Sequence, residues 1–124
     1  MLAMKRILIV DDETTIVEVL RDLLQESGYN VIVAMDGMQA TMQANKYKPD
    51  LILLDISMPA GGGVAVYNRL KQNPDTQNIP IVFLTAMPPA DLAQKIPFAN
   101  DVTVFRKPFK QKELLELIQK MLPG

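Results

Sequence analysis

The chain has 124 residues and a formal net charge of −1, and it contains neither cysteine nor histidine. This length suits one domain that buries a core without disulfides or structural metals. The near-neutral charge argues against direct partnership with nucleic acid. Without histidine or cysteine, the chain excludes serine–histidine–aspartate and cysteine–histidine catalysis and the usual zinc sites. Acid–base chemistry must therefore use carboxylates, lysine or water.

The N-terminus lacks the pattern of a signal peptide, because Lys5-Arg6 is followed by only four apolar residues before a run of acids. No apolar stretch approaches the roughly 20 residues that cross a bilayer. The absence of cysteine is compatible with a reducing compartment. We therefore expect a cytoplasmic protein with no membrane partner.

Short apolar runs alternate with segments of helical periodicity along the chain. Leu114, Leu117 and Ile118 illustrate the helical spacing near the C-terminus. Gly28 stands where it would end the first helix, and Asp36 where it would cap the second. The expected order is strand 7–10, helix 14–27, strand 31–34, helix 37–46, strand 51–54, helix 64–72, strand 81–84, a helix within 89–99, strand 102–105 and helix 111–121.

Two segments between these elements carry special composition. Residues 60–63 include three consecutive glycines, and we expect a flexible loop because no lysine–serine pair follows, as it would in a phosphate-binding loop. Pro97 falls inside the fourth expected helix. An interior proline removes a hydrogen bond and costs roughly 3 kcal/mol, so that helix should be short or distorted.

Five strand–helix units in series predict a doubly wound α/β fold. Helical crossovers between short apolar strands imply a parallel five-stranded sheet with helices on both faces. We expect residues 1–124 to form this single domain. The carboxyl ends of all five strands would then meet at one edge of the sheet, where open α/β sheets bind ligands.

Polar residues follow four of the predicted strands directly: Asp11-Asp12, Asp55, Thr85 and Lys107. Three carboxylates at one edge repel one another and raise one another's pKa, a conflict that a divalent cation removes. Mg²⁺ prefers oxygen ligands and leaves coordination positions for phosphate. Because a carboxylate can form an aspartyl phosphate, these residues predict a Mg²⁺ site with a nucleophilic carboxylate. Lys107 and Thr85 would contact the phosphoryl oxygens.

These sites resemble the motifs of response-regulator receiver domains. The matching residues are Ile9-Val10-Asp11-Asp12-Glu13, then Asp55 with Met58-Pro59 and Gly63, then Thr85-Ala86, and finally Lys107-Pro108-Phe109. Each motif alone is weakly specific, but the set occurs in order and at appropriate spacing over essentially the whole chain. The resemblance implies the flavodoxin-like fold, with strand order 2-1-3-4-5.

The resemblance also implies a metal site and a phosphoacceptor. Asp55 would be the aspartate that is phosphorylated. Asp12 would bind Mg²⁺ directly, and Asp11 directly or through water. Asp55 and the backbone carbonyl of Ser57 would complete the protein ligands.

The remaining motifs imply a switch. Lys107 would contact the phosphoryl group, Thr85 would move towards it, and the Lys107–Pro108 peptide bond would be cis. The position three before the lysine is usually aromatic or histidine in this family and couples to the threonine. Here it is Val104, so the aromatic half of the usual switch is missing, and Phe105 is expected to pack in the core.

A receiver of this kind would be a signalling switch rather than an enzyme, catalysing only its own phosphorylation and dephosphorylation. It would take a phosphoryl group from a sensor histidine kinase or a histidine phosphotransfer protein. It would then act on a downstream protein through the face made by the fourth helix, fifth strand and fifth helix.

Three other functions stay open at this point. One is a receiver-like binding module that acts without phosphorylation. Another is a Mg²⁺-dependent phosphatase with Asp55 as nucleophile, although such enzymes commonly carry an aspartate two residues later, where this chain has Ser57. A nucleotide-binding flavodoxin-like protein is a weaker possibility, because no phosphate loop is visible.

Overall fold

The computed structural model describes residues 4–57, 62–88, 90–91 and 103–123. Five parallel strands form one sheet in the order β2-β1-β3-β4-β5. The predicted doubly wound fold and its strand order are therefore confirmed. The elements are β1 (Arg6–Val10), α1 (Thr14–Glu26), β2 (Asn30–Ala34), α2 (Gly37–Tyr47), β3 (Leu51–Asp55), α3 (Gly62–Gln72), β4 (Ile81–Thr85), β5 (Thr103–Arg106) and α5 (Gln111–Met121).

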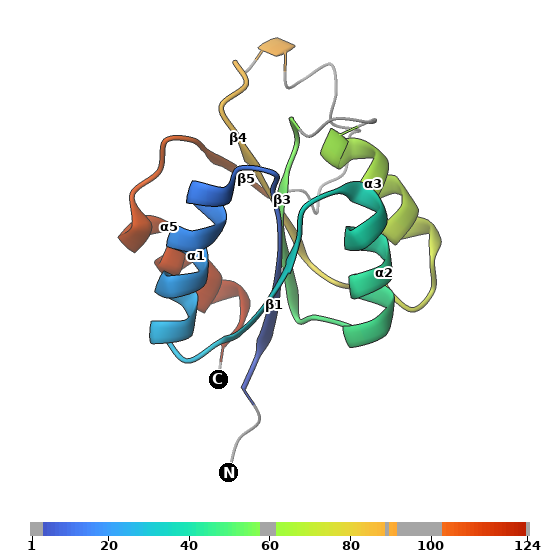
Figure 1. Ribbon diagram of the computed structural model, residues 1–124, viewed down its shortest axis with the longest axis horizontal. Helices are drawn as coiled ribbons and strands as arrows, with labels where there is room; N and C mark the ends of the chain where they lie inside the picture. The colour runs from blue at the N-terminus through green and yellow to red at the C-terminus, as the bar shows by residue number, and fades with distance from the viewer. Residues whose placement is uncertain (1–3, 58–61, 89, 92–102, 124) are drawn as a thin grey trace.

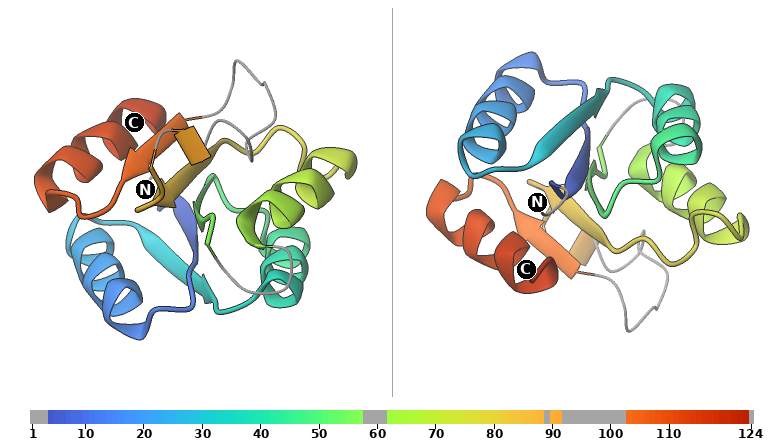
Figure 2. Two further views of the ribbon diagram at one scale, coloured as in Figure 1. Left: turned by 90° about the horizontal axis from the view of Figure 1, so that it is seen from above. Right: turned by 90° about the horizontal axis from the view of Figure 1, so that it is seen from below.

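Helices cover both faces of the sheet, with α1 and α5 on one face and α2 and α3 on the other (Figures 1 and 2). Alternate residues of the central strands serve the two faces: Ile7 and Ile9 pack with α1 and α5, whereas Leu8 and Val10 pack with α2 and α3. Because both faces are buried, these strands need continuous apolar runs rather than alternating ones. This is why the runs were recognisable in the sequence.

Local signals fix the helix ends that the sequence predicts. At the end of α1, Gly28 has φ +94°, and the N–H groups of Gly28 and Tyr29 donate to the carbonyls of Gln25 and Leu24. These are the two bonds of a Schellman motif. At the start of α2, Asp36 Oδ1 accepts a hydrogen bond of 2.8 Å from the Gln39 N–H. Among the described residues, no helix has the length and apolar character needed to span a bilayer.

The prediction of a flexible loop over residues 60–63 is wrong for Gly62 and Gly63. Gly62 and Gly63 are the first residues of α3, and Gly63 is buried. The Gly63 N–H donates to the Ile56 carbonyl at 3.0 Å, so the glycines form a fixed helix start instead of a loose connection. The predicted fourth helix, with Pro97, lies outside the described residues except for two helical positions, 90 and 91.

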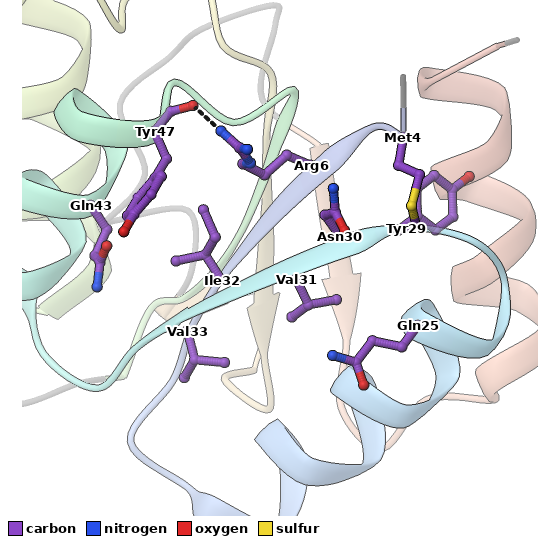
Figure 3. Close-up of a pocket in the computed structure, with 10 residues that line it drawn as sticks. All are labelled: Met4, Arg6, Gln25, Tyr29, Asn30, Val31, Ile32, Val33, Gln43 and Tyr47. Atoms are coloured by element: carbon purple, nitrogen blue, oxygen red, sulfur yellow. Dashed lines mark hydrogen bonds between the residues drawn. The ribbon is translucent and has the colours of Figure 1, made fainter. Parts of the chain in front are cut away.

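A hollow of about 680 Å³ lies along the outer edge of β2. Gln25 of α1 lines one side, and Gln43 of α2 lines the other (Figure 3). Arg6 at its end donates from Nη1 to the Tyr47 carbonyl at 2.9 Å, and its guanidinium stacks over the Tyr47 ring. The hollow is lined by Met4, Arg6, Gln25, Tyr29, Asn30, Val31, Ile32, Val33, Gln43 and Tyr47.

Candidate functional site

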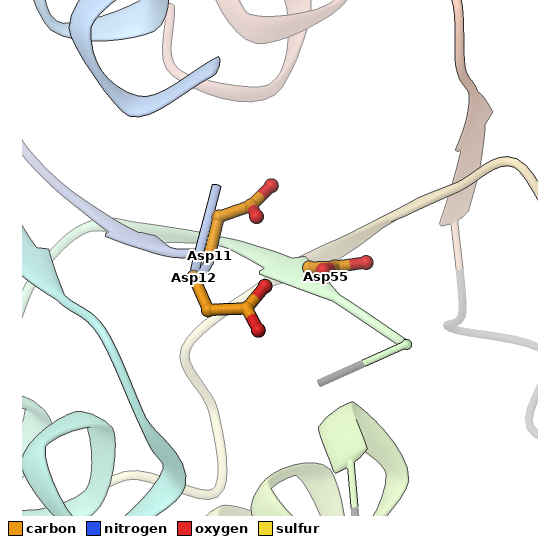
Figure 4. Close-up of side chains that lie close together, drawn as sticks. All are labelled: Asp11, Asp12 and Asp55. Carbon is orange, nitrogen blue, oxygen red and sulfur yellow. The ribbon is translucent and has the colours of Figure 1, made fainter. Parts of the chain in front are cut away.

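Three carboxylates converge where β1 and β3 end (Figure 4). The two strands are neighbours, and Val10 is paired with Leu54, so the acids that follow them meet at one point of the sheet edge. One carboxylate oxygen from each of Asp11, Asp12 and Asp55 lies within 4.8 Å of the others. Asp11 is fully buried and Asp55 is 3% exposed, whereas Asp12 faces solvent. The convergence predicted for these acids is therefore present.

Lys107 reaches this cluster from the end of β5. Its Nζ lies 2.9 Å from Asp11 Oδ2, 3.5 Å from Glu13 Oε1 and 3.7 Å from Asp55 Oδ1. Burial alone would lower the pKa of Lys107, but the hydrogen bond and charge of Asp11, together with the charges of Asp55 and Glu13, raise it. Lys107 is therefore a fixed ammonium between two buried carboxylates.

The electrostatics of Asp55 differ from those of an ordinary surface acid. Burial raises the pKa of its carboxyl, and the charges of Asp11 and Asp12 raise it further. A hydrogen bond of 3.1 Å from the Ser57 N–H to Oδ1 and the charge of Lys107 act in the opposite direction without cancelling the rise. The carboxylates therefore carry more negative charge than the nearby ammonium neutralises.

This donor set fits a hard divalent cation. The clustered ligand atoms are all carboxylate oxygens, which Mg²⁺ prefers, and Asp12 leaves the cluster open to solvent on one side. Burial is the main cause of the raised pKa of Asp55, and a cation placed there would relieve the repulsion from Asp11 and Asp12 that adds to it. The open side would leave room for water or phosphate oxygens.

Thr85 ends β4 at the same edge and is fully buried. Its Oγ1 accepts a hydrogen bond of 2.9 Å from the Met87 N–H, so the hydroxyl is engaged by its own loop. Its carbonyl accepts a bond of 2.7 Å from the Lys107 N–H, which ties the end of β4 to the residue after β5. The Lys107–Pro108 peptide bond is cis, as predicted.

A glycine beneath the phosphoacceptor candidate sets the position of its backbone. A Cβ added at Gly63 would lie 2.3 Å from the Asp55 carbonyl oxygen and 2.9 Å from Ile56 Cα, closer than real Cβ atoms approach. Only glycine therefore allows α3 to begin so close to the end of β3. The three-glycine run was a visible signal, but it was interpreted as a flexible loop rather than a close contact.

The structure adds two residues whose roles the sequence did not predict. Glu13 follows the aspartate pair and forms an ion pair with Lys107. Arg106 precedes Lys107 and donates from Nη2 to the Met87 carbonyl at 2.6 Å. The only signals in the sequence are that Glu13 is the third acid in a row and that Arg106 stands next to another cation. Neither signal indicates which group the residue contacts.

The parallel sheet with helices on both faces defines a doubly wound α/β protein, and its carboxyl edge carries a cluster of acids beside a lysine. The family profile described as "response regulator receiver domain" matches residues 7–119. The chain belongs to this family. Receiver domains are signalling switches that bind Mg²⁺ in an acidic site and interact with histidine kinases or phosphotransfer proteins.

Individual relatives agree with this membership. The chain is 34% identical over 119 residues to sporulation initiation phosphotransferase F of Bacillus subtilis, covering 96% of this chain and 94% of that protein. It is 36% identical to the phosphate regulon transcriptional regulatory protein PhoB of Escherichia coli over 95% of its own length, but it spans only 52% of PhoB.

Solved structures give the same result for the fold. Chemotaxis protein CheY4 of Vibrio cholerae superposes with a TM-score of 0.87 at 29% identity, covering 96% of this chain and 99% of that one. The receiver domain of sensor histidine kinase PA1611 from Pseudomonas aeruginosa superposes with a TM-score of 0.84 at 28% identity, covering 98% and 100%. That domain was solved with a magnesium ion coordinated in its active-site cleft.

Proposed function

We propose that Asp55 accepts a phosphoryl group in a Mg²⁺-dependent reaction and that this modification switches the chain's binding to protein partners. The observation that carries the proposal is the setting of Asp55. It is a buried carboxylate whose pKa is raised, 3.7 Å from the Lys107 ammonium and within reach of two further acids. This combination suits a nucleophile that needs a cation to balance its charge.

The carboxylates of Asp11, Asp12 and Asp55 would hold the ion, together with the backbone carbonyl of Ser57. Bound Mg²⁺ supplies positive charge opposite the charge that develops on the transferring phosphoryl oxygens. The close approach of the three carboxylates supports this ligand set. The Ser57 N–H already bonds to Asp55 Oδ1, which keeps the Ser57 peptide beside the site.

In the transfer itself, an Asp55 carboxylate oxygen attacks phosphorus of a phosphohistidine on the donor protein. The new O–P bond forms as the N–P bond breaks, and the imidazole leaves with the electron pair and takes up a proton. Lys107 stands beside Asp55 and would donate to a phosphoryl oxygen. Thr85 would release the Met87 N–H and turn its hydroxyl towards another phosphoryl oxygen.

A sensor histidine kinase or a histidine phosphotransfer protein would supply the phosphoryl group. The output would be a downstream protein bound at the face formed by the fourth helix, β5 and α5, with no direct role for nucleic acid or membrane. In this proposal residues 1–124 act as one cytoplasmic receiver domain. Ser57, two residues after Asp55, cannot act as the general acid that a phosphatase would use, which favours a switch over a turnover enzyme.

The test is intact-mass measurement after incubation with acetyl phosphate. Wild-type protein should gain one phosphoryl group only when Mg²⁺ is present, and Asp55→Asn should gain none. Asp75→Asn makes the same change at an exposed aspartate beyond α3 and should behave as wild type. A gain that persists in Asp55→Asn, or that does not need Mg²⁺, would contradict the proposal.

A further inference from the structure

The peptide groups of Met87 are held on both sides by side chains. Its N–H donates to Thr85 Oγ1 at 2.9 Å, and its carbonyl accepts from Arg106 Nη2 at 2.6 Å. The first bond engages the hydroxyl that would move towards a phosphoryl group. The second connects the same residue to the strand that carries Lys107. Met87 is therefore a link between the end of β4 and the end of β5.

The sheet register places Arg106 for this contact. Thr85 pairs with Arg106 across β4 and β5, and the Lys107 N–H donates to the Thr85 carbonyl at 2.7 Å. Because side chains alternate along a strand, Arg106 lies on the same face of the sheet as Val104. Val104 and Met87 both pack, partly buried, against the core between the sheet and the α2–α3 layer.

We propose that Arg106 is a positioning residue that holds the loop 85–87 in its resting arrangement and thereby sets how readily Thr85 moves. The inference rests on the proposed phosphorylation of Asp55, since Thr85 moves towards that group. Val104 has an apolar side chain, which offers no hydrogen bond to the loop 85–87. The guanidinium two residues later instead supplies the link between β5 and the loop.

The Arg106–Met87 hydrogen bond is strong enough to shift the equilibrium between loop conformations but not to prevent the loop from moving. Arg106 is exposed and its bond joins a charged donor to a neutral carbonyl, so its loss should shift the loop equilibrium by about threefold to tenfold. Arg106→Gln removes the charge. Arg106→Lys keeps a cation that can still donate to the carbonyl, although without the planar geometry of the guanidinium.

The experiment combines two measurements on the same variants. Amide hydrogen exchange at the Met87 N–H reports the opening of its bond to Thr85, and the rate of mass gain from acetyl phosphate with Mg²⁺ reports access to the phosphorylated state. In Arg106→Gln, both should rise about threefold to tenfold. Arg106→Lys should restore most of the difference. Arg69→Gln removes the same charge at an exposed position two helical turns along α3 from Gly62 and should change neither.

Two results would overturn the inference. Unchanged Met87 exchange in Arg106→Gln would mean that the bond does not hold the loop. Faster exchange with an unchanged or slower phosphorylation rate would mean that the bond is structural and does not oppose the movement of Thr85. If wild-type protein gains no phosphoryl group at all, the proposed function fails separately. The role of the Arg106–Met87 hydrogen bond is then tested by Met87 amide exchange in Arg106→Gln and by its return towards the wild-type rate in Arg106→Lys.

Discussion

Two regions of this molecule present polar atoms at an edge of the sheet, and they differ in charge balance. The hollow beside β2 measures about 680 Å³, and Arg6, the only charged side chain among the described residues that line it, donates to the Tyr47 carbonyl (Figure 3). At the carboxyl edge, Asp11 and Asp55 lie close together (Figure 4) and are buried. Among the described residues, Lys107 supplies the one ammonium that forms an ion pair with them. The excess of buried charge therefore lies at the carboxyl edge and not beside β2.

The difference in charge balance is what distinguishes the acidic edge as the candidate site. Removing a carboxylate from water costs several kcal/mol unless charge or hydrogen bonds compensate, so excess buried acid persists where a ligand neutralises it. Burial is the main cause of the raised pKa of Asp55, and the charges of Asp11 and Asp12 add to it. In the hollow, an arginine bonded to a backbone carbonyl leaves no such excess.

The largest expected effect contrasts the two regions directly. Lys107→Met removes the ammonium that stands 3.7 Å from Asp55 Oδ1. The rate of phosphoryl gain from acetyl phosphate should fall about 100-fold, the usual loss when one charge-stabilising donor is removed from a reacting centre. Gln43→Met, in the hollow, should change that rate by no more than about twofold. Intact mass followed over time measures both.

Circular dichroism and Mg²⁺ titration are the controls for Lys107→Met, because the variant leaves Asp11 buried without its partner. Folded protein that still binds Mg²⁺ but reacts slowly fits the assigned role. An equal fall in Gln43→Met would contradict the contrast between the two regions and would place part of the chemistry beside β2.

Alanine substitutions at two glycines, one beside the acidic cluster and one away from it, test how the backbone positions the acids. In Gly63→Ala the new Cβ would meet the Asp55 carbonyl oxygen at 2.3 Å, so the free energy of unfolding should fall by about 1–3 kcal/mol through overpacking. Gly28→Ala has open space but a φ of +94°, and should cost about 1 kcal/mol. Urea denaturation measures both losses.

Mg²⁺ affinity separates these two variants, because only Gly63 contacts the backbone that carries Asp55. Calorimetric titration should show weaker Mg²⁺ binding in Gly63→Ala and wild-type binding in Gly28→Ala. Equal Mg²⁺ affinity in both variants would show that the position of α3 does not set the position of the acids.

The smallest expected effect concerns stability and pH. Because the pKa of Asp55 is raised in the folded state, the unfolded chain loses this proton first as pH rises above 3.8, and the folded state is then penalised. Asp55→Asn avoids the penalty, so without Mg²⁺ at pH 7 its Tm should exceed that of wild type by about 2–4 °C. The difference should shrink as pH falls towards 3.8. A lower Tm for Asp55→Asn at pH 7 would contradict this account.

Much of the fold and the acidic site could be predicted because each depends on local sequence. Continuous apolar runs marked the strands buried on both faces, and the polar residues after four of the five runs marked the carboxyl edge. Lys107 and Asp11 could be placed together because the parallel topology brings all strand ends to one edge. Asp36 and Gly28 act on helix ends within a few residues of themselves, so their roles were also readable.

The contacts that the sequence did not predict depend on packing. Gly63 looked flexible as part of a glycine run, but its lack of a side chain serves contact with the Asp55 backbone. Arg106 belongs to no motif that the sequence analysis identified, and its partner is a backbone carbonyl 19 positions away, for which no residue type is diagnostic. Glu13 continued a run of acids, and its pairing with Lys107 depends on the lysine, which follows β5, lying at the same sheet edge as the end of β1.

The bond between Lys107 and Asp11 joins residues 96 positions apart, and Asp55 lies between them in the chain. Closing so long a loop is costly in entropy and is favourable only once the intervening strands are paired. A chain that is still being synthesised, or one that has lost β5, can hold its aspartates without holding the lysine beside them. If Asp55 is the phosphoacceptor, as proposed, only chains that have completed the sheet would hold the ammonium beside it, and incompletely folded copies would react more slowly with a phosphoryl donor.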